Sequence, residues 1–80
     1  MYLYLQAFPE NLTNLSVNEI ANTLRKLKIP DPVIDNFQEG QIDGDTFVCL
    51  TKEILDQFGV GPLHQLKILK FKSGWRPNDS

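Results

Sequence analysis

The carboxylates of residues 39–47, EGQIDGDTF, are the side chains of this sequence with the clearest potential for chemistry. A calcium loop would need oxygen ligands at its first, third and fifth positions and a bidentate glutamate at its twelfth. A loop that starts at Asp43 has Asp45 in third place but Phe47 in fifth and Ile54 in twelfth. The stretch therefore does not match a calcium site.

An acid–base pair of Asp43 and Asp45 would need one carboxyl group desolvated beside a substrate pocket. Both aspartates fall in a short polar turn instead, which favours solvated charges. His64 could act as a base for a Cys49 nucleophile, but Cys49 lies within FVCL, where we expect a buried, inert thiol. We therefore expect no catalysis, no metal and no cofactor.

Composition places the chain among small globular domains. Its 80 residues suit one domain, and a net charge of −2 argues against general affinity for nucleic-acid phosphates. Cys49 is the only cysteine, so neither an internal disulfide nor a cysteine cluster can form. The longest apolar runs are far below the roughly 20 residues of a membrane span. These features predict a cytoplasmic protein with no membrane span.

A first helix is predicted after Ser16, which has Glu19 three residues on and can form a capping box. Its apolar stripe consists of Val17, Ile20, Leu24 and Leu27. Pro30 is expected to stop this helix.

A second helix is predicted between Asp31, a capping residue, and Gly40, which suits the left-handed position after a helix. Pro32 would occupy its first helical position. Its short apolar face consists of Val33, Ile34 and Phe37.

Two short helices and a long one follow. Asp43 can cap a turn that carries Phe47 and Val48 inward, and Thr51 can cap a segment that Gly59 closes. Pro62 begins the longest helix, whose expected core residues are Leu63, Leu66 and Leu69, with Ile68 as a further candidate. The pattern predicts an all-α domain of five helices, and the alternating residues 2–6 suggest an extended arm.

The order of these features resembles the sterile alpha motif (SAM) domain. The likeness is carried by Leu24, by IDGDTFVCLTKEIL at 42–55, by FGV at 58–60 and by LKIL at 66–69. It implies a compact SAM-like five-helix bundle at 13–73, an N-terminal arm at 1–12 and a C-terminal tail at 74–80.

The sequence departs from the SAM pattern at four positions. Leu15 replaces a frequent tryptophan, Thr23 an aromatic residue, and Leu63 and Gln65 replace the glycine and basic residue at the start of the last helix. FPENL near the front and SGWRP after the last helix resemble the C-terminal SAM domain of the Grb2-associated regulators of Erk/MAP-kinase signalling.

The resemblance implies a non-catalytic protein–protein interaction module of a signalling adaptor in growth factor receptor and MAP kinase pathways. SAM domains often associate through an acidic mid-loop surface on one partner and a basic end-helix surface on the other. The acidic residues expected to contact a partner are Glu39, Asp43, Asp45, Glu53 and Asp56. The end-helix residues are Leu63, His64, Lys67 and Lys70.

Charge is segregated along the chain as that scheme requires. Between residues 31 and 56, seven acids are opposed by Lys52 alone, which gives −6, whereas the charges of residues 63–77 are all positive. Solubility and helix-dipole matching would give a similar pattern. Because the last helix lacks the usual basic residue at its start, we expect binding to another SAM domain or signalling protein with weak or no homo-oligomer. The alternatives are RNA-hairpin or lipid-headgroup binding through the lysine-rich last helix, and a purely structural element.

Overall fold

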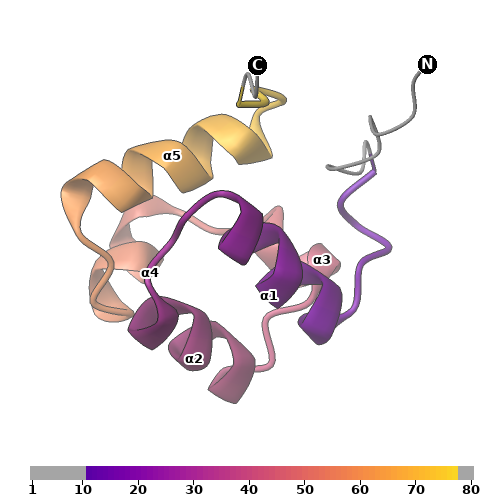
Figure 1. Ribbon diagram of the computed structural model, residues 1–80, viewed down its shortest axis with the longest axis horizontal. Coiled ribbons are helices and arrows are strands. Elements are labelled where there is room, and N and C mark those ends of the chain that lie inside the picture. Colours follow the sequence, from indigo (N-terminus) through magenta and orange to yellow (C-terminus); the bar gives the residue numbers. More distant parts are fainter. Residues whose placement is uncertain (1–10, 78–80) are drawn as a thin grey trace.

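The computed structural model describes residues 11–77, which form five α-helices and no strand (Figure 1). In chain order the helices are α1 (Val17–Lys26), α2 (Asp31–Glu39), α3 (Gly44–Phe47), α4 (Lys52–Gln57) and α5 (Pro62–Lys72). The all-α prediction of five helices is confirmed, and so is the shortness of the third and fourth. The arm expected at residues 2–6 lies outside the described residues.

Three helices start at the residues that the sequence indicates. The Ser16 hydroxyl accepts a hydrogen bond from the Glu19 amide at 3.1 Å, and the Glu19 carboxylate accepts one from the Ser16 amide at 2.8 Å. Asp43 caps α3 and Thr51 caps α4 through their side-chain oxygens. Each cap satisfies an amide that the first turn of a helix leaves without a partner.

The start of α2 differs from the prediction that Asp31 caps it. Pro30 occupies the cap position with an extended backbone, φ −62° and ψ 147°, and no side chain makes a capping hydrogen bond. Asp31 is instead the first residue of the helix. Its carboxylate still lies at the positive end of the helix dipole, where a negative charge is favourable.

Four of the described helices end in the same hydrogen-bonded turn, a Schellman motif. At the end of α1, Lys28 is left-handed with φ 66°, and the Ile29 amide donates to the Leu24 carbonyl at 3.1 Å. The left-handed residues that end α2, α4 and α5 are Gln41, Gly59 and Gly74. The residue after each one is apolar: Ile29, Ile42, Val60 and Trp75. Each turn thereby folds an apolar side chain back onto the core.

These turns correct two predicted helix ends. Helix α1 ends at Lys26 rather than at Pro30, because the chain must turn at Lys28 to bury Ile29. Gly40 is not left-handed, with φ −80°; Gln41 adopts that conformation with φ 59°. Gly59 does close α4 in the left-handed region, as predicted, with φ 76°.

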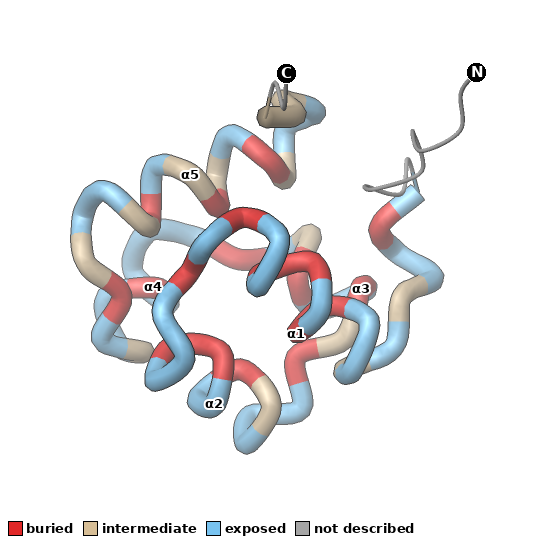
Figure 2. Tube along the Cα trace, viewed as in Figure 1, coloured by how far each residue is buried: buried red, intermediate tan, exposed pale blue. Residues whose placement is uncertain are grey.

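One hydrophobic core joins all five helices, and each of them contributes buried residues to it (Figure 2). Helix α1 packs against α2 and α3, and α4 packs against α5. Aromatic rings meet edge to face within the core: Phe37 with Phe58 at 5.3 Å, and Phe47 with Phe71 at 6.4 Å between ring centroids. Val48 is partly buried against this core, as expected, and Trp75 is partly buried against it too.

Helix α5 faces the core with a different side from the predicted one. Leu63 and Leu66, expected inside, are 77% and 56% exposed, while Gln65 and Phe71 are buried together with Ile68. The Gln65 amide donates to the Val60 carbonyl at 2.9 Å and to the Asp56 carboxylate, which holds this polar residue inward. Ile68 and Phe71 follow Gln65 at intervals of three and so lie on the same side.

Cys49 is exposed, so the prediction of a buried thiol is wrong. Its neighbours explain the result: Phe47 and Leu50 are both buried. The turn that ends α3, with a hydrogen bond from the Leu50 amide to the Phe47 carbonyl, brings these two side chains inward and leaves Cys49 outside.

Candidate interaction surface

The acidic loop 39–47 is held against the segment that precedes α1. Gly44 is buried, and its amide donates a hydrogen bond to the Leu15 carbonyl at 2.8 Å. A Cβ atom at this position would lie 1.9 Å from the Leu12 carbonyl oxygen and 2.8 Å from the Leu15 amide nitrogen. Such separations are far below van der Waals contact, so only glycine permits this approach of two backbones.

The side chain of Asp43, the residue before Gly44, forms a hydrogen bond with the backbone. Its carboxylate accepts a hydrogen bond from the Thr46 amide at 3.1 Å. This bond lowers the pKa of Asp43 below its ordinary value, and a hydrogen bond with the Thr46 side chain acts in the same direction. The Asp43 carboxylate therefore caps the N-terminus of α3, in agreement with the prediction.

Asp56 is also engaged within the domain. One carboxylate oxygen accepts from Gln65, and the other lies 3.2 Å from the Lys52 ammonium in an ion pair across one turn of α4. The Gln65 hydrogen bond is the largest cause of a lowered pKa at Asp56, followed by the hydrogen bond from Lys52. Since Gln65 is buried, Asp56 links α4 to α5.

Glu39, Asp45 and Glu53 differ from these two aspartates. All three side chains are exposed, and none has a hydrogen bond or ion pair within residues 11–77. Lys52 is the only cationic residue between positions 31 and 56 of the sequence, and it already forms an ion pair with Asp56. Their negative charges thus remain available to an external cation. We call these three residues the acidic surface.

The α2 helix adds to this negative potential. Asp31, Asp35 and Glu39 follow one another at intervals of four, so they form a row on one side of the helix, and all are exposed. Like charges at this interval cost an isolated helix about 0.2–0.5 kcal/mol per pair. Asp31 stabilises the start of the helix through the helix dipole, but the repetition of like charges at Asp35 and Glu39 does not stabilise it.

A shallow hollow of about 360 Å³ lies where the ends of α2 and α4 meet. Glu39 and Gly40 line one part of it, and Gln57 and Phe58 another. Asn36 joins the two helices, because its side-chain amide donates to the Phe58 carbonyl at 3.1 Å. The position of Glu39 relative to α4 is thereby set by direct contacts.

The lysines of α5 are directed largely at the domain itself. Lys67 donates to the Leu27 carbonyl at 2.9 Å, and Lys72 donates to the Leu50 carbonyl at 2.8 Å. Leu27 is the C-cap of α1, so Lys67 neutralises the negative end of that helix. Two of the three lysines of the last helix therefore make hydrogen bonds within the domain, and α5 does not present an open basic face.

Replacing Lys67 with methionine should lower the free energy of unfolding by about 1–2 kcal/mol, because the charged hydrogen bond to Leu27 is lost. Urea unfolding followed by circular dichroism measures the change. The control is Lys70→Met, since the Lys70 ammonium lies 4.7 Å from the centre of the Trp75 ring, whereas the Lys67 ammonium donates to a backbone carbonyl. We expect about 0.5 kcal/mol there. Equal losses in both variants would contradict a special role for Lys67.

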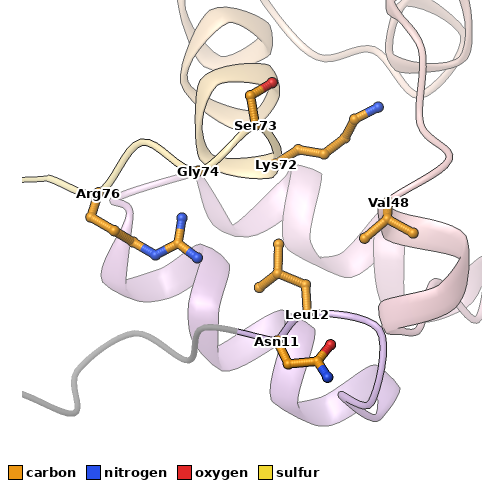
Figure 3. A pocket seen from close by; sticks show the side chains of 7 residues that line it. All are labelled: Asn11, Leu12, Val48, Lys72, Ser73, Gly74 and Arg76. Atoms are coloured by element: carbon orange, nitrogen blue, oxygen red, sulfur yellow. The ribbon is translucent and has the colours of Figure 1, made fainter.

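A second hollow, of about 510 Å³, lies at the C-terminal end of α5 (Figure 3). Two cations line it, but Figure 3 shows the Lys72 ammonium directed away from the Arg76 guanidinium. Arg76 donates to the Phe71 and Trp75 carbonyls at 3.0 and 2.8 Å, and it stacks on the Phe71 ring at 4.1 Å. The two charges do not converge on one anion.

The remaining end-helix candidates lie near the start of α5. Leu63 is exposed, and His64 is partly buried with an Nδ1 atom that has no hydrogen-bond partner among residues 11–77. Sequence reasoning missed Gln65 and Leu66 at this end. The pairing of Gln65 with Asp56 depends on how α4 and α5 meet, and no spacing along the chain signals it.

In the described part of the chain, no group of three or more histidine, cysteine, aspartate or glutamate side chains could hold a metal ion. None of its helices has the length and apolar character needed to cross a bilayer.

The chain belongs to the SAM (sterile alpha motif) domain family, whose model matches residues 13–72, or 60 of the 80 residues. No solved structure gives a significant match. SAM domains are generally protein–protein interaction modules without enzymatic activity. This class accords with the fold and with a surface that holds uncompensated carboxylates outside the core.

Proposed function

We propose that the domain binds another protein through the acidic surface of Glu39, Asp45 and Glu53. The observation that carries this proposal is that these carboxylates are exposed and lack partners within residues 11–77, while the carboxylates of Asp43 and Asp56 accept hydrogen bonds from within the domain. Charge of one sign on a rigid surface steers a basic partner and sets its orientation more than it adds affinity.

Asp43 and Asp56 contribute to this surface indirectly. Asp43 starts α3, which carries Asp45, and Asp56 ties the end of α4, whose first turn carries Glu53. Their charges add to the local potential, but their oxygens are already accepting hydrogen bonds. In the proposed complex, Asp45 and Glu53 therefore make direct contacts, and Asp43 and Asp56 position them.

A second contact surface is proposed on α5, with Leu63, His64, Lys67 and Lys70. We place the domain in a cytoplasmic signalling adaptor of growth factor receptor and MAP kinase pathways, related to the Grb2-associated regulators, with another SAM domain or signalling protein as partner and weak or no homo-oligomer. RNA-hairpin or lipid-headgroup binding is disfavoured, because Lys67 and Lys72 already donate to backbone carbonyls.

The test compares the wild type with Asp45→Asn/Glu53→Gln in affinity purification from cell lysate, followed by titration of each purified partner. The control is Asn14→Lys/Asn18→Lys, which raises the net charge by the same amount at exposed positions before and within α1. We expect partners to bind the acidic-surface variant at least tenfold more weakly and the control about as well as the wild type.

Two results would contradict this function. Partners that bind the acidic-surface variant as tightly as the wild type would remove Asp45 and Glu53 from the interface. An equal loss in the control would show that net charge, rather than this surface, governs binding.

A further inference from the structure

Six serine or threonine side chains lie within residues 11–77, and the fold engages five of them. Each of the five is buried, caps a helix or forms a hydrogen bond with a neighbouring side chain: Thr13, Ser16, Thr23, Thr46 and Thr51. Ser73 is the exception, because it is exposed and its hydroxyl makes no hydrogen bond within residues 11–77. An enzyme that modifies Ser73 therefore breaks no hydrogen bond of the acceptor hydroxyl.

Ser73 is the residue at which α5 ends. Its backbone amide donates to the Leu69 and Lys70 carbonyls, each at 3.1 Å, so the turn fixes its backbone but not its side chain. Gly74 follows with a φ of 113°, and it has no side chain that would shield the hydroxyl. In Figure 3 the Ser73 oxygen is directed away from Leu12. The hydroxyl thus lies on the surface of an exposed turn.

The charged residues near Ser73 in the sequence are all positive. Lys70 and Lys72 precede it by three residues and by one, and Arg76 follows it by three. No acidic residue occurs between positions 57 and 78, whereas the hydroxyl residues that cap helices each have a glutamate within three residues. Protein kinases choose among acceptor residues partly by the pattern of charge around them. The pattern at Ser73 is complementary to a kinase whose substrate groove is acidic.

We propose that Ser73 is a phosphorylation site for a protein kinase that recognises basic residues on both sides of the acceptor. The Ser73 oxygen attacks the γ-phosphorus of ATP, and a bond between Oγ and phosphorus forms. The bond from that phosphorus to the β–γ bridging oxygen breaks, and ADP leaves with the electron pair. The hydroxyl proton passes to a carboxylate base of the kinase.

Two of the flanking cations make contacts within the same turn. The Lys70 ammonium lies over the Trp75 ring, and Arg76 donates to the Phe71 carbonyl. These contacts join residues 70–76 to one another, so local opening of the last turn of α5 breaks them together. Helix ends open at a lower free energy than core segments do. Because Phe71 is fully buried, the open form is rare, and phosphorylation is slower than in an unfolded chain.

A phosphate on Ser73 experiences two opposing effects. Its charge of about −1.5 to −2 lies at the negative end of α5, which carries roughly half a unit of charge and repels it. Lys70, three residues earlier, lies on the same side of the helix and attracts it with a full charge. The attraction is the larger effect, so the domain stays folded and the Lys70 ammonium moves from the Trp75 ring to the phosphate.

Phosphorylation also changes the charge of this end of the domain. Residues 63–77 contain four positive charges and no negative one, which gives +4, and phosphoserine reduces this to about +2. The second contact surface on α5 then meets a partner with about half its positive charge, which changes the rate of association. This consequence rests on the proposed function, whereas the phosphorylation of Ser73 does not.

The experiment incubates the purified chain with ATP and the catalytic domain of protein kinase C, which prefers basic flanking residues, and locates phosphate by mass spectrometry. Parallel reactions use casein kinase 2, which prefers acidic flanking residues, and a cell lysate, which supplies other kinases. Ser73→Ala removes the acceptor, and Lys70→Gln/Lys72→Gln removes two flanking charges. The control, Lys26→Gln/Lys28→Gln, removes the same charge at exposed positions near the end of α1.

We expect protein kinase C to phosphorylate Ser73 at least about tenfold faster than any other hydroxyl of residues 11–77, and casein kinase 2 to leave Ser73 unmodified. The rate should fall at least about tenfold in Lys70→Gln/Lys72→Gln and stay unchanged in the control. Loss of the Lys72–Leu50 hydrogen bond loosens α5 and by itself would raise the rate, so a fall isolates the recognition of charge. The NMR signals of the Trp75 amide and indole groups should shift on phosphorylation.

Absence of phosphate at Ser73 in both the protein kinase C reaction and the lysate would overturn the proposal. Equal rates in the wild type and in Lys70→Gln/Lys72→Gln would remove the role of the flanking charges. A phosphorylated domain that is unfolded by circular dichroism, or Trp75 signals that do not shift, would contradict the movement of Lys70. None of these measurements involves a partner, so failure of this proposal and failure of the acidic surface are distinguishable.

Discussion

Gly44→Ala should destabilise the domain by about 3 kcal/mol or more, toward the upper end of what overpacking a core costs. The added Cβ would lie 1.9 Å from the Leu12 carbonyl oxygen, and two further backbone atoms would be within 2.9 Å. Because these neighbours are backbone, no side-chain rotation relieves the overlap. The segment before α1 must move away, which breaks the Gly44–Leu15 hydrogen bond. Urea unfolding monitored by circular dichroism measures the loss.

Gly61→Ala is the matched control for this substitution. Gly61 has an ordinary φ of −66°, and the nearest atom to an added Cβ is a His64 ring carbon at 3.9 Å. Alanine is a poorer N-cap than glycine, so a loss of about 0.5–1 kcal/mol is expected. If Gly44→Ala unfolded at the same urea concentration as Gly61→Ala, the close approach of the two segments would not exist in solution.

Ile68→Ala should cost about 2–5 kcal/mol, while Leu66→Ala, two positions earlier on the same helix, should cost less than about 1 kcal/mol. Ile68 is fully buried, so its truncation loses the transfer free energy of the side chain and leaves a cavity. Leu66 is 56% exposed, and water can occupy the space that alanine vacates. Chemical denaturation of the two variants in parallel gives the difference.

The comparison tests which side of α5 faces the core. Both substitutions shorten an aliphatic side chain to alanine, so their effects on helix propensity are small beside the burial term. A larger loss for Leu66→Ala than for Ile68→Ala would reverse the orientation of α5.

Local signals predicted most of the helix starts. Ser16, Asp43 and Thr51 cap their helices because a short polar side chain can reach a free amide within the same turn, whatever the rest of the chain does. Helix ends were less predictable. A left-handed lysine or glutamine is used at Lys28 and Gln41, where burying the following isoleucine compensates for the backbone cost.

The acidic surface was predictable only as a group of charged residues. The sequence shows seven acids opposed by one lysine between residues 31 and 56, but it does not show which carboxylates are already engaged. Tertiary contacts decide this: Gln65, from another helix, binds Asp56, whereas Glu39, Asp45 and Glu53 receive no such donor within residues 11–77.

By itself, the sequence determined the all-helical class, the order of the five helices, the caps of α1, α3 and α4 and the excess of negative charge, since each depends on residues close together along the chain. Only the tertiary structure decided which side of α5 is buried. The leucines of α5 suggested one side, but the hydrogen bonds of Gln65 to Asp56 and Val60 and the burial of Ile68 and Phe71 require another. Contacts between helices outweigh the pattern within one helix because α5 is apolar on more than one side.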